Sequence, residues 1–190
     1  TFTAQLRSLR ELVSSPGPRL DLLLGQRQPT ADASRQLTRS YSPAYDDILL
    51  KAKRANDFFL LVGPPGTGKT SMALRFMVEE ALTDASASLL LMSYTNRAVD
   101  EICAMLDEAA IDYLRIGGAY TCDARFRPHL LDSRLGAAPR LDQVRHTLVS
   151  ARVVVATTST LQSRAYLFEL RQFSLAIVDE ASQILEPSVV

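Results

Sequence analysis

The sequence is poor in the residue types that build metal centres and disulfides. Only two cysteines and two histidines occur among its 190 residues. Cys103 and Cys122 stand nineteen positions apart, a spacing that fits neither a zinc ligand pair nor a C-x-x-C redox pair. We therefore expect two reduced thiols and no structural metal.

Long apolar runs are also missing. The run Phe58–Val62 is five residues long, whereas roughly 18–20 apolar residues are needed to span a bilayer. The chain does not open on a basic, apolar and small-residue leader. With 47% apolar and 22% charged residues, the composition excludes a disordered tail, a collagen-like repeat and a disulfide-stapled miniprotein. The sequence predicts a soluble, intracellular and hence cytoplasmic protein with no membrane partner.

A net charge is lacking too, since 21 basic residues balance 21 acidic ones. The two signs are nevertheless unevenly placed. Basic residues exceed acidic ones by four in residues 1–55 and by three in residues 111–152, whereas acidic residues exceed basic ones by five in residues 56–110 and by two in residues 153–190. Such an excess can form a positive surface beside a nucleic acid, and it is as often a solvated face.

The chain has room for one domain with an appendage. Residues 1–40 predict an N-terminal helical extension and linker, and residues 41–190 predict the main domain. Ser42 and Pro43 fit the N-cap and first residue of a helix that runs to about Ala55. Residues 117–138, rich in glycine and arginine, predict an irregular excursion from the main domain.

Within the main domain, β and helical patterns alternate, which is typical of βαβ units and a mostly parallel sheet. The fold class is therefore α/β. The expected strands are Phe58–Val62, Ser88–Ser93, Asp112–Ile116, Arg152–Thr157 and Leu175–Val178, and the expected helices are 68–82, 97–109, 140–149, 159–168 and 181–186.

A glycine-rich loop follows the first expected strand and fills the pattern G-x-x-x-x-G-K-[ST] at every fixed position. Glycines let backbone N–H groups curl around triphosphate oxygens. Lys69 would neutralise the β/γ-phosphates, and the Thr70 hydroxyl would be a Mg²⁺ ligand. The alternative is an ordinary strand-to-helix turn, and the strand, loop and helix in sequence favour the nucleotide site. The expected cofactors are ATP and Mg²⁺, and the nucleotide-binding residues are Gly63, Pro64, Pro65, Gly66, Thr67, Gly68, Lys69 and Thr70.

A second candidate half of this site is the pair Asp179 and Glu180, which follows the apolar strand Leu175–Val178. Asp179 would hold the Mg²⁺ through a water, and Glu180 would orient and deprotonate the attacking water. An acidic pair at a strand end is often only an exposed helix start. Beside an intact phosphate loop, the functional interpretation is favoured.

Five stretches together resemble the 5′-to-3′ branch of superfamily 1 helicases, which contains the nonsense-mediated-decay RNA helicase and the Okazaki-fragment nuclease-helicase. The similarity covers about residues 40–190. The stretches are D-E-A-S-Q at Asp179–Gln183 with Glu186 and Pro187 behind it, G-P-P-G-T-G-K-T at Gly63–Thr70, T-N-R-A-V-D at Thr95–Asp100, L-R-I-G at Leu114–Gly117 and the threonine-rich Thr157–Thr160.

This resemblance implies a RecA-like P-loop NTPase with a three-layer fold, truncated after the Walker B strand. The implied function is that of the first motor domain of an ATP-dependent helicase or translocase. Its partners would be single-stranded DNA or RNA and a second RecA-like domain of the same full-length chain. Because that domain normally supplies an arginine finger, we expect the 190 residues alone to bind nucleotide weakly and to hydrolyse it slowly.

The resemblance also implies site residues. Lys69, Glu180 and Gln183 would be catalytic, with Gln183 near the γ-phosphate. Sugar–phosphate contacts would come from Thr95, Asn96, Thr157, Thr158 and Ser159. Simpler interpretations exist, because Asn96 and the threonine run can be helix caps and Gln183 can be an exposed helical residue.

The chain departs from this family at the base-recognition position. No glutamine stands upstream of the phosphate loop, where family members usually carry one for adenine; Tyr41 or Tyr45 could stack on a base or be a packed surface aromatic. Two alternatives to a helicase stay open. One is an AAA-type P-loop ATPase that acts on proteins, and the other is a nucleotide-binding scaffold without turnover.

Overall fold

The computed structural model describes residues 3–14, 17–64, 66 and 68–184. The chain divides into two compact units, one of residues up to 67 and the other of Gly68–Ile184. The first unit contains the helices α1 (Thr3–Ser14), α2 (Pro18–Leu23) and α3 (Asp46–Arg54). An isolated antiparallel bridge joins Ala31 to Ala55.

Helix α3 begins later than the sequence predicts. The predicted cap at Ser42 is wrong, because the helix starts at Asp46 and Tyr45 occupies the N-cap position. The Asp46 carboxylate instead accepts hydrogen bonds from the backbone N–H groups of Tyr41 at 2.8 Å and Ser42 at 3.0 Å, and from the Ser40 hydroxyl. These three donors, the Ser40 hydroxyl foremost, hold the pKa of Asp46 below its usual value.

The second unit is built on a four-stranded parallel sheet in the order β2-β3-β1-β4. Its strands are β1 (Leu89–Ser93), β2 (Leu114–Ile116), β3 (Val153–Thr157) and β4 (Leu175–Val178). In the register, Ser93 pairs with Thr157 and Met92 pairs with Val178. The α/β class with a mostly parallel sheet is confirmed.

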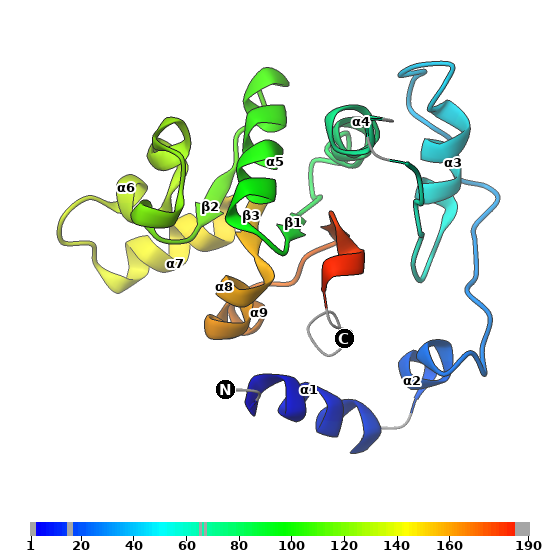
Figure 1. Ribbon diagram of the computed structural model, residues 1–190, viewed down its shortest axis with the longest axis horizontal. Coiled ribbons are helices and arrows are strands. Elements are labelled where there is room, and N and C mark those ends of the chain that lie inside the picture. Colours follow the sequence, from blue (N-terminus) through cyan, green and yellow to red (C-terminus); the bar gives the residue numbers. More distant parts are fainter. Residues whose placement is uncertain (1–2, 15–16, 65, 67, 185–190) are drawn as a thin grey trace. The chain divides into compact units, whose positions relative to one another are not determined.

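Helices cover both faces of this sheet (Figure 1). On one face, α5 (Asn96–Glu108) and the helix Lys69–Leu74 with its continuation α4 (Arg75–Ala81) join a core that includes Leu89, Leu91, Val153 and Val155. On the other face, α7 (Leu141–Ser150), α8 (Thr158–Ser163) and α9 (Tyr166–Leu170) contribute to a second core around Leu90, Met92 and Val154. The helix, sheet and helix layers form the three-layer fold that the sequence predicts.

One predicted strand does not form. Phe58–Val62 is irregular, and the side chains of Leu60 and Val62 are 75% and 91% exposed. A strand has no hydrogen bonds of its own and needs a neighbour. In the part of the chain that the structure describes, no strand pairs with this segment, and β1 lies between β3 and β4. The apolar pattern predicts an extended run, but it does not specify its partner.

Two predicted helices also differ. The helix expected at 159–168 is divided into α8 and α9, because Arg164 adopts a non-helical φ of −125° and ψ of 41°. The helix expected at 181–186 is a 3-10 turn at Ala181–Gln183, and its predicted last residues lie outside the described part of the chain. The predictions at 97–109 and 140–149 agree with α5 and α7 to within one residue at each end.

Residues 117–138 are more ordered than their composition indicates. They contain 3-10 turns at Ala119–Thr121 and Ala124–His129 and the short helix α6 (Leu131–Leu135). Leu130 packs into the core on the α5 side, whereas its neighbour Leu131 packs into the core on the other side. Leu130 also makes an isolated parallel bridge with Arg115 in β2. The segment therefore lies along the outer edge of β2, which would otherwise be open.

Cys103 and Cys122 are both buried, and neither forms a disulfide. Among the helices of the described residues, none is both long and apolar enough to cross a membrane.

Candidate functional site

The predicted site residues follow three neighbouring strands at the edge where those strands end. Thr95 and Asn96 come after β1, Ser159 after β3, and Asp179 and Glu180 after β4. Since β3, β1 and β4 are adjacent and parallel, their carboxyl ends lie at the same edge. This edge is where open α/β sheets bind their ligands.

At this edge Thr70 and Asp179 are in direct contact. The Thr70 hydroxyl donates a 2.9 Å hydrogen bond to the Asp179 carboxylate across 109 positions of sequence. The Asp179 backbone is fixed on both sides: its N–H donates to the carbonyl of Met92 at 2.8 Å, and its carbonyl accepts from the Ser93 hydroxyl at 3.1 Å. The sheet thus holds the carboxylate that the sequence predicts for Mg²⁺.

The donor set at this contact fits a magnesium ion. A hydroxyl and a carboxylate oxygen are hard oxygen ligands, and Mg²⁺ in nucleotide sites is typically held by one or two protein oxygens, waters and the substrate's phosphates. Within the described ranges, no group of three or more His, Cys, Asp or Glu side chains could form an all-protein cage. The two residues therefore suit an ion that arrives with a nucleotide.

The phosphate loop is described only in part. Gly63, Pro64 and Gly66 belong to the first unit, and Gly68 and the residues after it belong to the second. Pro65, Thr67 and the Lys69 side chain lie outside what the structure describes. Gly66 and Gly68 have φ values of 77° and 75°, a left-handed conformation that glycine adopts without steric cost.

The helix after the loop starts with a wide turn. Lys69–Leu74 is a π-helix, in which the Gly68 carbonyl accepts from the backbone N–H groups of both Met72 and Ala73. Single π turns inside helices are frequent at functional sites. Here the wide turn carries Thr70.

Glu180 has an unusual backbone next to the predicted metal ligand. Its φ of 54° and ψ of 40° place it in the left-handed region, which few non-glycine residues occupy and which clusters at functional sites. The Gln183 side-chain amide donates a 3.3 Å hydrogen bond to the Glu180 carboxylate. The predicted base and the predicted γ-phosphate residue are thus neighbours.

The first predicted contacts to a nucleic-acid strand, Thr95 and Asn96, lie at the start of α5. Thr95 is the N-cap, and its hydroxyl accepts from the Ala98 N–H at 3.1 Å. The alternative that Asn96 is the cap is wrong, because Asn96 is the first helical residue. Both side chains are exposed. A capping hydroxyl in this position keeps its own proton available to an outside acceptor.

The second predicted group caps α8. Thr157 is the N-cap, and its hydroxyl accepts from the Thr160 N–H at 3.2 Å and lies 3.1 Å from the Ser159 hydroxyl. Thr157 and Thr158 are only 4% and 5% exposed, whereas Ser159 is exposed. Of these three residues, Ser159 offers the accessible hydroxyl.

The arginines of residues 111–152 mostly serve the fold. Four of the seven basic residues in this range pair with carboxylates, and a fifth, Arg152, donates to the backbone carbonyls of Leu82 and Ala87. The four pairs are Arg115 with Asp100, Arg125 with Asp123, Arg134 with Asp112, and Arg140 with Asp142. This pattern favours the structural interpretation of the local positive excess. In the first unit, the Arg39 guanidinium lies 4.6 Å from the centre of the Tyr41 ring.

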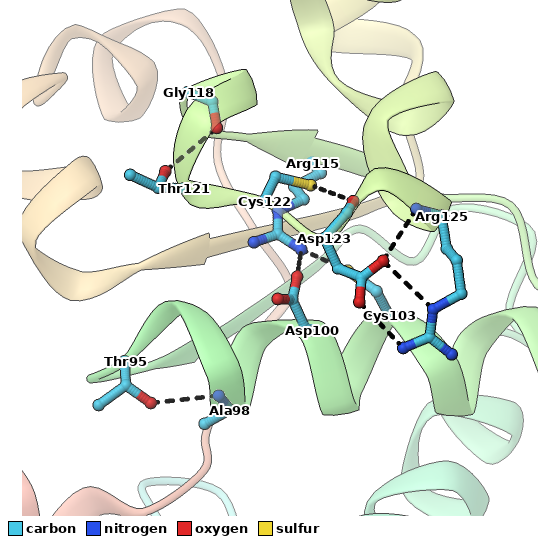
Figure 2. A network of polar contacts seen from close by, with 10 residues as sticks. All are labelled: Thr95, Ala98, Asp100, Cys103, Arg115, Gly118, Thr121, Cys122, Asp123 and Arg125. Atoms are coloured by element: carbon cyan, nitrogen blue, oxygen red, sulfur yellow. Dashed lines mark hydrogen bonds and ion pairs between the residues drawn. The ribbon is translucent and has the colours of Figure 1, made fainter.

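In one of these pairs the arginine is buried, and sequence reasoning missed the pairing. Arg115 of β2 is 2% exposed and bonds to Asp100 of α5 (Figure 2). Burial is the largest single influence on Arg115 and opposes its charge, but the hydrogen bond to Asp100 and the electrostatic interactions with Cys103, Cys122 and Asp100 together outweigh it, so the pKa of the guanidinium is raised. Burial also raises the pKa of the nearby Cys103 thiol to about 11. Both partners stand in recognised motifs, but neither motif indicates the pairing.

The fold and the site together define a P-loop NTPase, and comparison with known proteins specifies the family. Residues 42–142 match the family described as "AAA domain", and the chain belongs to it. The resemblance to superfamily 1 helicases is also confirmed.

The curated relatives are helicase/nucleases. The chain is 34% identical over 139 residues to "DNA replication ATP-dependent helicase/nuclease JHS1" of Arabidopsis thaliana, covering 73% of this chain and 10% of that protein. It is 30% identical over 163 residues to "DNA replication ATP-dependent helicase/nuclease DNA2" of Gallus gallus, covering 85% and 16%. The human protein of the same description is 31% identical over 139 residues, covering 72% and 13%. The chain thus spans between about a tenth and a sixth of the length of these three relatives.

Proposed function

We propose that this chain is the nucleotide-binding part of an ATP-dependent helicase that acts on single-stranded DNA. The observation that carries the proposal is the Thr70–Asp179 contact, which lies on the same sheet edge as the exposed Thr95 and Ser159. The same sheet edge thus carries two groups of residues. Thr70 and Asp179 form what we call the nucleotide end, and Thr95, Asn96 and Ser159 form what we call the strand end, because they would contact the DNA strand. DNA, rather than RNA, is supported by the names of the relatives, which describe DNA replication enzymes.

At the nucleotide end, the loop backbone and Lys69 bind the phosphates, and Thr70 and Asp179 hold the metal. Bound Mg²⁺ would offset the negative charge of the β- and γ-phosphates. The hydrogen bond between the Thr70 hydroxyl and the Asp179 carboxylate orients both oxygens before nucleotide arrives, which lowers the ordering cost of binding.

Turnover is assigned to Glu180, which orients and deprotonates the attacking water. Gln183 donates to this carboxylate and so keeps it directed. Because Gln183 is also expected near the γ-phosphate, it would couple the presence of that phosphate to the orientation of the Glu180 carboxylate. The arginine finger is assigned to a second RecA-like domain of the natural protein.

At the strand end, Thr95, Asn96 and Ser159 donate to phosphate oxygens of the DNA backbone. Such short polar groups track a strand without reading its bases. Thr157 and Thr158 are assigned to the same contact by resemblance, and their burial makes them supports for Ser159 rather than direct donors. An AAA-type ATPase acting on proteins has no need of these groups.

The test is ATP hydrolysis by the natural protein that carries this sequence, measured with and without single-stranded DNA or RNA at fixed salt. We expect several-fold stimulation by DNA. Lys69→Ala should abolish nucleotide binding, because it removes the positive charge that neutralises the β/γ-phosphates. A flat response to both nucleic acids would refute the helicase proposal, and stimulation by RNA alone would refute the assignment to DNA.

A further inference from the structure

The buried Arg115 of β2 pairs with Asp100 of α5, the helix whose start carries Thr95 and Asn96. Arg115 is the middle residue of β2 and is paired in register with Val155 of β3. Val155 belongs to the core that α5 covers. Residues paired in register on neighbouring strands point to the same face of a sheet, so the Arg115 side chain lies on the α5 face. Asp100 lies on α5, five positions after Thr95. In Figure 2, the Asp100 side chain points away from its helix and toward the guanidinium.

Packing alone does not explain this pair. A guanidinium that is 2% exposed is costly to bury, and apolar residues of similar volume usually stabilise a core at least as well. The distinctive property of a buried arginine ion pair is that its hydrogen bonds are directional, since a planar guanidinium bonds only where its N–H groups point. Apolar contacts allow a helix to slide, whereas this bond fixes where α5 lies along β2.

The surrounding contacts further restrict where α5 lies relative to β2. Arg115 also donates to the Cys103 sulfur at 3.7 Å, one turn further along α5. Its backbone pairs with Leu130 in the isolated bridge that covers the β2 edge. One side chain therefore bonds α5 at two successive turns, and the residues beside it are themselves held.

We propose that the Arg115–Asp100 pair positions the first turn of α5, so that Thr95 and Asn96 meet the phosphates of single-stranded DNA. The inference rests on the proposed function and deepens it. Arg115 and Asp100 touch no DNA and act through α5, so they are positioning residues. Their loss should weaken DNA binding without altering the nucleotide end, which is built from the loop helix and β4.

The experiment compares Asp100→Asn with the natural protein. Asparagine keeps the shape of the side chain and an oxygen acceptor, and the Asp100 side chain is 21% exposed, so the variant should fold. The probe is a fluorescent oligo(dT) strand, and the readouts are its dissociation constant, ATP hydrolysis without DNA, and the melting temperature. We expect DNA binding to weaken about five-fold, with hydrolysis without DNA unchanged.

Asp112→Asn is the matched control. Asp112 also forms a pair with an arginine, Arg134, but it precedes β2 at the end of the strand remote from the site edge. Its replacement removes the same charge from the same unit without touching α5. We expect oligo(dT) binding by this control to equal that of the natural protein.

A double-mutant cycle with Arg115→Gln tests whether the two residues act as a unit. If they do, the double variant binds DNA no more weakly than Asp100→Asn alone. If Arg115→Gln prevents folding, the comparison of Asp100→Asn with Asp112→Asn still decides the matter.

Two results would overturn the inference. Unchanged DNA affinity in Asp100→Asn would show that the pair serves stability alone. A parallel loss of DNA binding and of hydrolysis without DNA would show a general disturbance rather than positioning. If the natural protein itself does not bind oligo(dT), the proposed function fails first, and that outcome is distinct from a natural protein that binds DNA and a variant that binds it equally well.

Discussion

At the scale of single residues, Glu180 combines a strained backbone with a position beside the metal carboxylate. Ala110 is the other non-glycine residue with positive φ in the described part of the chain. Such strain persists only where the surroundings impose it. At Glu180 those surroundings are the end of β4, the Asp179 backbone bonded to Met92, and the amide of Gln183.

Glu180→Gln should separate binding from turnover. The substitution keeps the size of the side chain and an oxygen that accepts from Gln183, but it removes the base. We expect nucleotide affinity within about two-fold of the natural protein and a turnover rate lower by about 10²–10⁴. Nucleotide titration and single-turnover hydrolysis measure the two quantities. Glu101→Gln, which changes an exposed carboxylate on α5, is the control, and retained hydrolysis in Glu180→Gln would exclude Glu180 as the base.

At the scale of elements, the start of α5 has two roles that one residue fulfils. Thr95 accepts from the Ala98 N–H as a cap and is assigned to the DNA backbone through its hydroxyl proton. A cap needs only an acceptor, whereas a phosphate contact needs a donor without negative charge. These different requirements make the roles separable.

Thr95→Asp should keep the cap and lose the contact. Aspartate is as good an N-cap as threonine, so the melting temperature should be unchanged, whereas its charge repels a phosphate and should weaken oligo(dT) binding. Thr95→Ala removes the cap and should lower the free energy of unfolding by about 1 kcal/mol. Thermal unfolding and fluorescence anisotropy test the pair of variants. Unaltered DNA affinity in Thr95→Asp would mean that Thr95 is only a cap.

Prediction from the sequence succeeded for elements whose pattern is local. The run Leu89–Met92 is apolar and β1 is buried throughout, and α5 repeats its buried residues at helical spacing. It failed for Phe58–Val62, which has the same apolar character but no strand beside it among the described residues. It also missed the Arg115–Asp100 pair, because the two residues are brought together by packing of α5 on β2 and not by their spacing.

At the scale of the whole molecule, carboxylates with lowered pKa values predict how stability depends on pH. Hydrogen bonds to hydroxyls, backbone N–H groups and arginines hold these pKa values below the ordinary ones. The residues concerned are Asp32, Asp46, Asp57, Asp84, Asp112 and Asp123. The unfolded chain therefore binds more protons than the folded chain in the acid range.

Acid should therefore destabilise the folded chain. The stabilisation from these carboxylates is present above their unfolded pKa, near 3.8, and is lost as pH falls toward the folded values. We expect the free energy of unfolding in urea to be level between about pH 7 and pH 5 and to decline below about pH 4. Asp46→Asn should flatten part of that decline. A free energy that stays constant down to about pH 2.5 would contradict the expectation.

The sequence by itself determined the chemistry of this protein: a glycine-rich loop, an acidic pair at a strand end and hydroxyl residues at helix starts are local patterns, because glycine conformation, charge and capping are properties of short segments. The tertiary structure decided which of them meet. It paired Thr70 with Asp179, left Ser159 exposed while burying Thr157 and Thr158, and joined Arg115 to Asp100. Strand order and helix packing depend on surfaces far apart in the chain, so no local pattern specifies them.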